Sequence, residues 1–474
     1  MRLARPAAVL ACLALAACAS ARTPDVALPA AYEAPSGGGL EVQALDRWWA
    51  AFDDPELTRL VDQALAASPD ARSAAARLDE ARATARSALT AFLPQGDATG
   101  SARRTRTEDL AGTAVNIPGF STSGVSENYA ANFNVSWELD LFGRFFAARR
   151  SARGDQAAAR FAYEGARASL AANVADAYFQ ARGLAIQLED ARETVRIQAS
   201  LQDVARKKAE HGLGASSDAD RVAGDLAQAQ SQAASLEAEL QAAKRTLLVL
   251  MGQGAQPTAS LAIVAGVEAV PPVPASVPSE LLARRPDVRE AQARVASAAG
   301  RSDLSLLEFF PTFTLTPGLG WAKIVQPGFS STTQTWTIGG DVSQPILSIP
   351  KLLYDLKAQN ARTEQAVIAY EKAVQTAFGE AEGALVRLDS DRRRAILLAD
   401  GETRGRRAYE AARTRYAMGL DDLEAALSAE QSWRATRTQL TTVQVQALRR
   451  AVQTYKALGG GWPASALSAD ARAR

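Results

Sequence analysis

The chain has 474 residues, with 53 Lys and Arg against 52 Asp and Glu, so its formal net charge is only +1. A balance of this kind gives no large field of one sign, and binding to nucleic acid is not expected. One His and two Cys are too few for most zinc sites, disulfide frameworks or Cys–His nucleophile pairs. No catalytic acid–base pair or phosphate-binding glycine loop stands out, so we expect neither an enzyme nor a cofactor beyond a covalent lipid.

The N-terminus has the pattern of a secretion signal. Arg2 and Arg5 precede an apolar run that is too short to span a bilayer, and we predict a signal peptide over residues 1–17. The run ends in Leu15-Ala16-Ala17-Cys18, which resembles a bacterial lipobox. Cys18 would then become the first residue and carry acyl chains that anchor the protein to a membrane. Ordinary secretion with cleavage nearby is the alternative.

The two halves of the chain share the spacing of their prolines and short motifs. Pro69–Pro94 and Pro286–Pro311 are equal intervals of 25 residues, and the Ala-Tyr-Glu that begins at Ala162 recurs 207 residues later at Ala369. We therefore predict two tandem repeats. The predicted division is an N-terminal segment over 18–67, a first repeat over 68–255, a Pro-rich connector over 256–279, a second repeat over 280–462 and a disordered tail over 463–474.

In chain order, each half is predicted to form a helix, two strands, a long helix, a turn and another helix. In the first half the strands are the polar, non-helical segment 95–107 and the alternating segment 127–139, joined by a loop over 109–126. In the second half they are 312–323 and 333–347. Tyr129, Phe133 and Trp137 would share one face that could contact lipid. A small soluble sheet packed on both faces is the alternative.

Two long stretches without Pro, between Gly143 and Pro257 and between Pro350 and Pro463, are rich in Ala, Arg and Glu. Apolar residues recur in them at spacings of three and four, which predicts long helices packed through coiled-coil-like seams. Gly212 and Gly419 mark the predicted hairpin turns. A plain antiparallel coiled coil would satisfy this part of the pattern alone.

Several motifs together resemble the outer-membrane factor family of TolC-like channels, in its NodT-type lipoprotein branch. The resemblance covers about Trp48 to Trp462. The motifs that carry it are Trp48-Trp49 with Phe52, Pro55-Glu56-Leu57, the segment from Trp137 to Arg144 (WELDLFGR), Arg284-Arg285-Pro286-Asp287 and the segment from Tyr455 to Trp462 (YKALGGGW).

The resemblance implies a mainly α fold with a β-barrel portion. Three subunits would share a 12-stranded barrel in the outer membrane and a 12-helix α-barrel in the periplasm, surrounded by an equatorial region that includes part of 18–67. It implies a passive exit channel of a tripartite efflux system that exports drugs or other toxic small molecules. The implied partners are a periplasmic adaptor, an inner-membrane RND-type transporter and outer-membrane lipid. The alternatives are a structural coiled-coil envelope lipoprotein without a pore, metal efflux and type I protein secretion.

The resemblance also implies a gate at the periplasmic tip. Tyr416 and Asp218 occupy the positions of a gate tyrosine and its aspartate partner, and Ser217 lies at a second linking position. A hydroxyl–carboxylate hydrogen bond is charge-assisted and suits a latch. His211, beside the first turn, is expected to be exposed.

The gate region departs from the family pattern at the second hairpin. Ala425 and Ser428 stand where carboxylates are usual. Asp421, Asp422 and Glu424 lie close by and are candidate replacements, although Asp421 also takes the position of the usual basic partner. The alternative is that these acids are solvated residues favoured by the dipole at a helix start.

Overall fold

The computed structural model describes residues 28–33, 45–108, 124–212, 214–273 and 278–462. The chain divides into two compact units. The first unit contains the described residues of 79–158 and 291–369, and the second contains those of 25–78, 159–290 and 370–474. Cys18, most of the predicted loop over 109–126 and the predicted tail lie outside the described residues.

The order of elements confirms the predicted duplication. The first copy comprises α3 (Pro69–Thr90), β1 (Gln95–Thr107), β2 (Gly124–Leu139), α4 (Arg144–Glu210) and α5 (Ser216–Leu250). The second copy comprises α7 (Pro286–Leu307), β3 (Thr312–Gln326), β4 (Phe329–Ser343), α8 (Ile349–Ala417) and α9 (Leu423–Ala457). Short helices precede the two copies, namely η3 (Trp48–Phe52) and α2 (Pro55–Ala67) before the first and η4 (Thr258–Ser260) and α6 (Pro278–Arg284) before the second.

Three of the four strands have boundaries that differ from the sequence prediction. β3 ends at Gln326, three residues beyond the expected end. β2 begins at Gly124, three residues before the expected start, because residues 124–126 continue the ladder with the end of β1. β4 covers Phe329–Ser343 and not 333–347. Its start is set by a tight hairpin with β3, in which Gln326 pairs with Phe329. Its end falls just before Pro345, which has no N–H to donate to a ladder.

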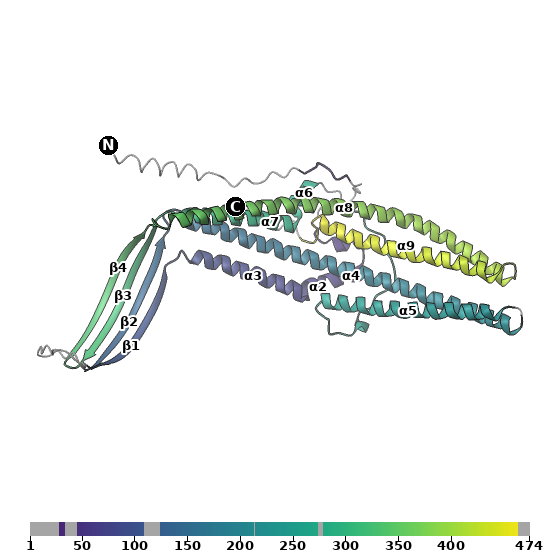
Figure 1. The fold of residues 1–474 in the computed structure, drawn as a ribbon, viewed down its shortest axis with the longest axis horizontal. Coiled ribbons are helices and arrows are strands. Elements are labelled where there is room, and N and C mark those ends of the chain that lie inside the picture. Colours follow the sequence, from purple (N-terminus) through teal and green to yellow (C-terminus); the bar gives the residue numbers. More distant parts are fainter. Residues whose placement is uncertain (1–27, 34–44, 109–123, 213, 274–277, 463–474) are drawn as a thin grey trace. The chain divides into compact units, whose positions relative to one another are not determined.

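The strands of the first unit form one antiparallel sheet in the order β1-β2-β3-β4 (Figure 1). Thr107 pairs with Gly124 and Gln326 with Phe329, so the ladders extend to the last residues of β1 and β3. The strands are neighbours in the sheet in the order in which they occur in the chain, as expected for two hairpins, one from each repeat. β1 and β4 are the two edges of the sheet, and each has one strand neighbour among the described residues.

Next to the sheet, α4 and α7 cross at small residues. A Cβ placed on Gly154 would lie 2.6 Å from the backbone nitrogen of Ser297, and one on Gly300 would lie 2.5 Å from that of Ser151. Glycine is therefore required for the two backbones to approach so closely. Asp155 accepts hydrogen bonds from Ser297 and Arg301 at 2.7 Å each, which fixes the crossing.

The second unit contains the main apolar core. The ring of Trp48 stacks on Tyr455 with centroids 5.7 Å apart, and Phe52 lies 5.1 Å from Phe179. These side chains are almost fully buried. The aromatic residues at the start and end of the family resemblance therefore meet, together with α4, in one cluster.

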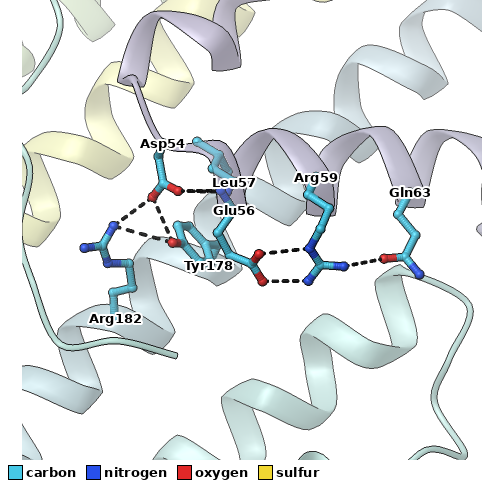
Figure 2. A network of polar contacts seen from close by, with 7 residues as sticks. All are labelled: Asp54, Glu56, Leu57, Arg59, Gln63, Tyr178 and Arg182. Atoms are coloured by element: carbon cyan, nitrogen blue, oxygen red, sulfur yellow. Dashed lines mark hydrogen bonds and ion pairs between the residues drawn. The ribbon is translucent and has the colours of Figure 1, made fainter. Parts of the chain in front are cut away.

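A buried polar network joins α2 to α4 beside this core (Figure 2). Asp54 caps α2 through Oδ1, which accepts from the backbone of Glu56 and Leu57 at 2.9 and 3.0 Å. Its Oδ2 accepts from the Tyr178 hydroxyl and Arg182 Nη1, both at 2.8 Å. Burial and the neighbouring carboxylate raise the pKa of Tyr178 well above its ordinary value, so the hydroxyl stays a donor.

Candidate functional site

The register of the sheet separates its residues into an apolar and a polar face. Side chains alternate along each strand and paired residues lie on the same side, so the ladders assign every residue to a face. On the apolar face the large side chains are Tyr129, Phe133, Val135, Trp137 and Leu139 of β2, Phe313, Leu315, Leu319 and Trp321 of β3, and Trp336, Ile338 and Val342 of β4. Small residues of β1, from Gly96 to Ala102, complete it.

The apolar face is open in the single chain. Trp336 is 75% exposed and Ile338 68%, and Phe133, Leu319 and Val342 are exposed as well. An extended exposed apolar patch on one side of a sheet marks a surface that contacts a membrane or another protein. The sequence prediction that Tyr129, Phe133 and Trp137 share one face is confirmed by their pairing with Lys323, Leu319 and Leu315 of β3, all on the same side.

The large side chains of the opposite face are polar, apart from Ile324 and Phe329 near the β3–β4 hairpin. Its residues include Asp97, Thr99, Ser101 and Arg103 of β1, Asn128, Asn132, Asn134 and Glu138 of β2, Thr314 and Thr316 of β3, and Ser331, Thr333, Thr335, Thr337 and Asp341 of β4. Hydroxyl and amide groups of this kind suit contact with water. The sheet can therefore separate an apolar medium from an aqueous one, as the strands of membrane channels do.

The WELDLFGR motif holds the junction between β2 and α4. Asp140 accepts three backbone hydrogen bonds at the start of α4, from Gly143, Arg144 and Phe145, each at 2.8 Å. Arg144 in turn pairs with Glu138 at 2.8 Å. The most specific motif of the resemblance is thus a helix cap that sets how the strand passes into the long helix.

The second-repeat motif has a similar structural role. Arg285 donates to Asp287 and Glu380 at 2.6 and 2.7 Å and to the backbone oxygen of Ala457 at 3.2 Å. Trp462 Nε1 donates to the backbone oxygen of Arg284 at 2.7 Å. The Arg-Arg-Pro-Asp segment and the C-terminal Gly-Gly-Gly-Trp segment are therefore bound to each other.

At the tip of the α4–α5 hairpin, Gly212 adopts a φ of +70°, which suits the predicted turn. His211 is exposed, as predicted, and its Nδ1 lies 2.7 Å from the backbone oxygen of Lys207. Ser217 and Asp218 lie in the first turn of α5, and both are exposed. The carboxylate of Asp218 is thus available to a partner outside this hairpin.

At the α8–α9 tip, Gly419 has a φ of +74°. Tyr416 is half-buried, and the Lys208 ammonium lies 4.1 Å from the centre of its ring. A cation–π contact therefore joins the two hairpin tips of one chain. Between Tyr416 and Asp218, both within the described residues, the structure records no hydrogen bond, so their latch stays a prediction for contacts between subunits.

The three acids near the second turn have different surroundings. Asp421 receives two hydrogen bonds from Arg415, at 2.7 and 3.0 Å. Asp422 caps α9 by accepting from the backbone of Ala425 at 2.8 Å. Glu424 is exposed in the first turn of α9. Asp422 thus has the helix-start role that the sequence left open. Glu424 is the acid of the three with no recorded bond to another described residue.

Sequence reasoning missed a buried polar contact between α4 and α9. Glu430 is fully buried, and its Oε2 accepts from Gln198 Nε2 at 3.1 Å. Burial raises the pKa of this carboxyl, although Arg434 lies 3.4 Å away. The signal in the sequence is a Glu at an apolar seam position, since Ala426, Leu427 and Trp433 around it are buried. That signal does not distinguish it from the solvated acids of the same helix.

Among the described residues, no group of three or more His, Cys, Asp or Glu side chains is placed to hold a metal ion. Within the same ranges, no helix combines the length and apolarity required to cross a membrane.

Comparison with known proteins identifies the family. The profile of the outer membrane efflux protein family matches residues 60–253 and 277–460. The chain is 31% identical over 458 residues to the pyoverdine export outer membrane protein OpmQ of Pseudomonas putida, covering 95% of this chain and 96% of that protein. It is 27% identical over 425 residues to the toluene efflux pump outer membrane protein TtgC of the same species, covering 89% and 87%.

Solved structures agree. The outer-membrane channel OprN superposes with a TM-score of 0.79 at 28% identity, over 93% of this chain and 98% of OprN. The MtrE channel of Neisseria gonorrhoeae, solved in an open state, gives a TM-score of 0.79 at 24% identity, over 93% and 97%, and supports the fold alone. The resemblance drawn from the sequence motifs is confirmed, and the chain belongs to the outer membrane efflux protein family, as an efflux channel protein of the outer membrane.

Proposed function

We propose that three copies of this chain form the passive exit channel of a tripartite pump. The observation that carries the proposal is the sheet, which has an open apolar face, a polar face and two edge strands. An open edge presents unpaired N–H and C=O groups, which lipid cannot satisfy. Pairing β1 of one copy with β4 of the next would satisfy both edges and close the three sheets into one barrel.

In this arrangement the apolar face contacts lipid and the polar face lines the aqueous path. The chain enters α4 directly after β2 and α8 soon after β4, so each hairpin would continue into helices on the periplasmic side. Cys18 would add a lipid anchor. A tethering coiled-coil lipoprotein without a pore would have no use for this apolar face, and family membership sets that alternative aside.

We propose that the exported molecules are small organic compounds, by analogy with relatives named for pyoverdine, toluene and antibiotics. Export of metal ions and of protein are the other classes that the sequence leaves open. A periplasmic adaptor and an RND-type inner-membrane transporter are the proposed partners. The chain itself would supply a duct and no chemical step.

The first experiment is the mass of the native complex, extracted in detergent from outer membranes. A trimer with ion conductance in planar bilayers is the expected result. A monomer, or release from the membrane without detergent once the Cys18→Ala variant removes the lipid, would contradict the shared channel. Loss of resistance to small toxic compounds in a deletion strain, restored by the wild-type chain, would support the proposed cargo.

A further inference from the structure

The apolar face of the sheet ends in a group of charged residues. Its charged side chains are Arg104, Arg106, Glu127 and Lys323, and all of them lie toward the end of β1, the start of β2 or the end of β3. From the row of Phe313 to the row of Trp321, this face carries no charge among the described residues. The charges therefore occupy three neighbouring rows at one end of the sheet.

Within this group the positive charges exceed the negative ones. Arg104 lies 3.6 Å from Glu127, and Arg106 lies 2.6 Å from Glu108, the residue that follows β1. Glu127 also accepts a hydrogen bond from the Tyr129 hydroxyl at 3.1 Å. The Lys323 ammonium is exposed and has no ion pair or hydrogen bond among the described residues. Both Arg side chains are more than 70% exposed, so all three cations can reach an external anion.

The height of the group matches the surface of a lipid layer. From Phe313 to Trp321, β3 advances eight residues, or about 26 Å at about 3.3 Å per residue, and about 20 Å after an ordinary strand tilt. Aromatic side chains prefer the boundary between hydrocarbon and headgroups. Tyr129 lies in the same row as Lys323, and Trp321 lies in the next row toward the apolar band. The cations therefore lie where the lipid headgroups begin.

We propose that Arg104, Arg106 and Lys323 form a binding site for the phosphate groups of lipid headgroups in the outer leaflet. The site rests on the proposed function, which places this end of the sheet at the cell surface. Its occupant follows from charge complementarity and from continuity with the lipid-facing band. With three copies the site would occur three times around the channel.

The test compares two variants in detergent-solubilised trimers. The triple variant Arg104→Gln, Arg106→Gln, Lys323→Gln removes the cations and keeps polar side chains. The single variant Arg103→Gln is the matched control, because Arg103 is the neighbouring residue in β1 but points with Asn128 to the polar face. The probes are lipid A, which carries phosphate groups, and the same lipid after enzymatic dephosphorylation, with binding followed by native mass spectrometry.

Wild type and Arg103→Gln are expected to bind lipid A at least tenfold more tightly than the triple variant, since each cation near an anionic surface contributes measurably. Dephosphorylated lipid A should bind all three proteins equally. Equal binding of lipid A to wild type and triple variant would overturn the proposal. It would also be overturned if inorganic phosphate alone bound to wild type as well as lipid A does. Because trimer mass and conductance are measured on the same samples, failure of the lipid site is distinguishable from failure of the channel.

Discussion

At the residue scale, Asp54 connects local and tertiary structure with one carboxylate. It caps α2 with one oxygen and holds Tyr178 and Arg182 of α4 with the other. Replacing it by Ala should cost about 1 kcal/mol for the cap and more for the buried Arg182, which would keep Glu268 at 2.7 Å and the Tyr178 hydroxyl at 3.5 Å as partners. We predict that Asp54→Ala lowers stability by about 2–4 kcal/mol, measured as a fall in melting temperature by circular dichroism.

The matched control for this prediction is Glu56→Ala. Glu56 lies two residues away, and its ion pair with Arg59, drawn in Figure 2, is exposed. Exposed pairs contribute at most about 1 kcal/mol. If both variants lose the same stability, the network does not hold α2 in place.

Glu430 gives a prediction in pH. Burial raises its pKa, so the folded protein binds this proton more tightly than the unfolded chain does. Its contribution to stability is therefore present below the ordinary Glu pKa of about 4.3 and declines as pH rises through the folded value. We predict that Glu430→Gln, which mimics the protonated form, gains stability relative to wild type between pH 4.5 and 7, by about 1 kcal/mol.

Melting temperatures from pH 4 to 8 would check this, with Glu424→Gln as the control. Glu424 lies in the same helix but is exposed, so the same substitution there replaces no buried carboxyl. A Glu430→Gln curve parallel to the wild-type curve would mean that the buried carboxyl does not titrate differently on folding.

At the element scale, alternation was clearest in β2, where Tyr129, Phe133 and Trp137 fall at every fourth position, although its start was placed three residues late. β1 has only Gly and Ala on its apolar face below the charged rows, so the sequence indicated a strand there only through the lack of a helical pattern. β4 was placed too late because Ile346 and Leu347 continue an apolar pattern after Pro345, which the ladder cannot include. Pattern alone does not show where hydrogen bonding stops.

The two faces of β4 allow a direct test of its orientation. Trp336 and Thr337 are neighbours, but Trp336 belongs to the apolar face and pairs with Leu319 in its middle rows. An Arg near the middle of a lipid-facing band costs about 2–4 kcal/mol. We predict that Trp336→Arg lowers the amount of trimer in outer-membrane fractions several-fold, whereas Thr337→Arg leaves it near the wild-type amount. If Thr337→Arg lowered the amount of trimer and Trp336→Arg did not, the face of Thr337 would be the one that contacts lipid.

At the scale of the whole molecule, the motifs that identified the family are mainly structural. Asp140 caps α4, Arg285 binds the end of α9, and Trp48 stacks on Tyr455. Because such roles require particular side chains, the motifs can be recognised in the sequence. The tips were harder to predict, because exposed acids at a helix start have the same sequence whether they cap, pair or face a pore. Lys208, which contacts Tyr416, lies 208 residues before it and carries no local signal.

The last prediction concerns opening of the channel. In one chain the Lys208–Tyr416 contact holds the two tips together, and a trimer would repeat it three times. If the predicted latch between Tyr416 and Asp218 adds contacts between subunits, Tyr416→Ala breaks both sets, whereas Asp218→Ala breaks only the second and Lys208→Ala only the first. Conductance in planar bilayers should therefore rise most for Tyr416→Ala and less for the other two. Thr414→Ala, whose hydroxyl donates to the backbone oxygen of Glu410 within α8, should conduct like wild type. Tyr416→Ala is the only variant of the set that removes both contacts. If its conductance equals that of wild type, the contacts that close the channel lie away from these tips.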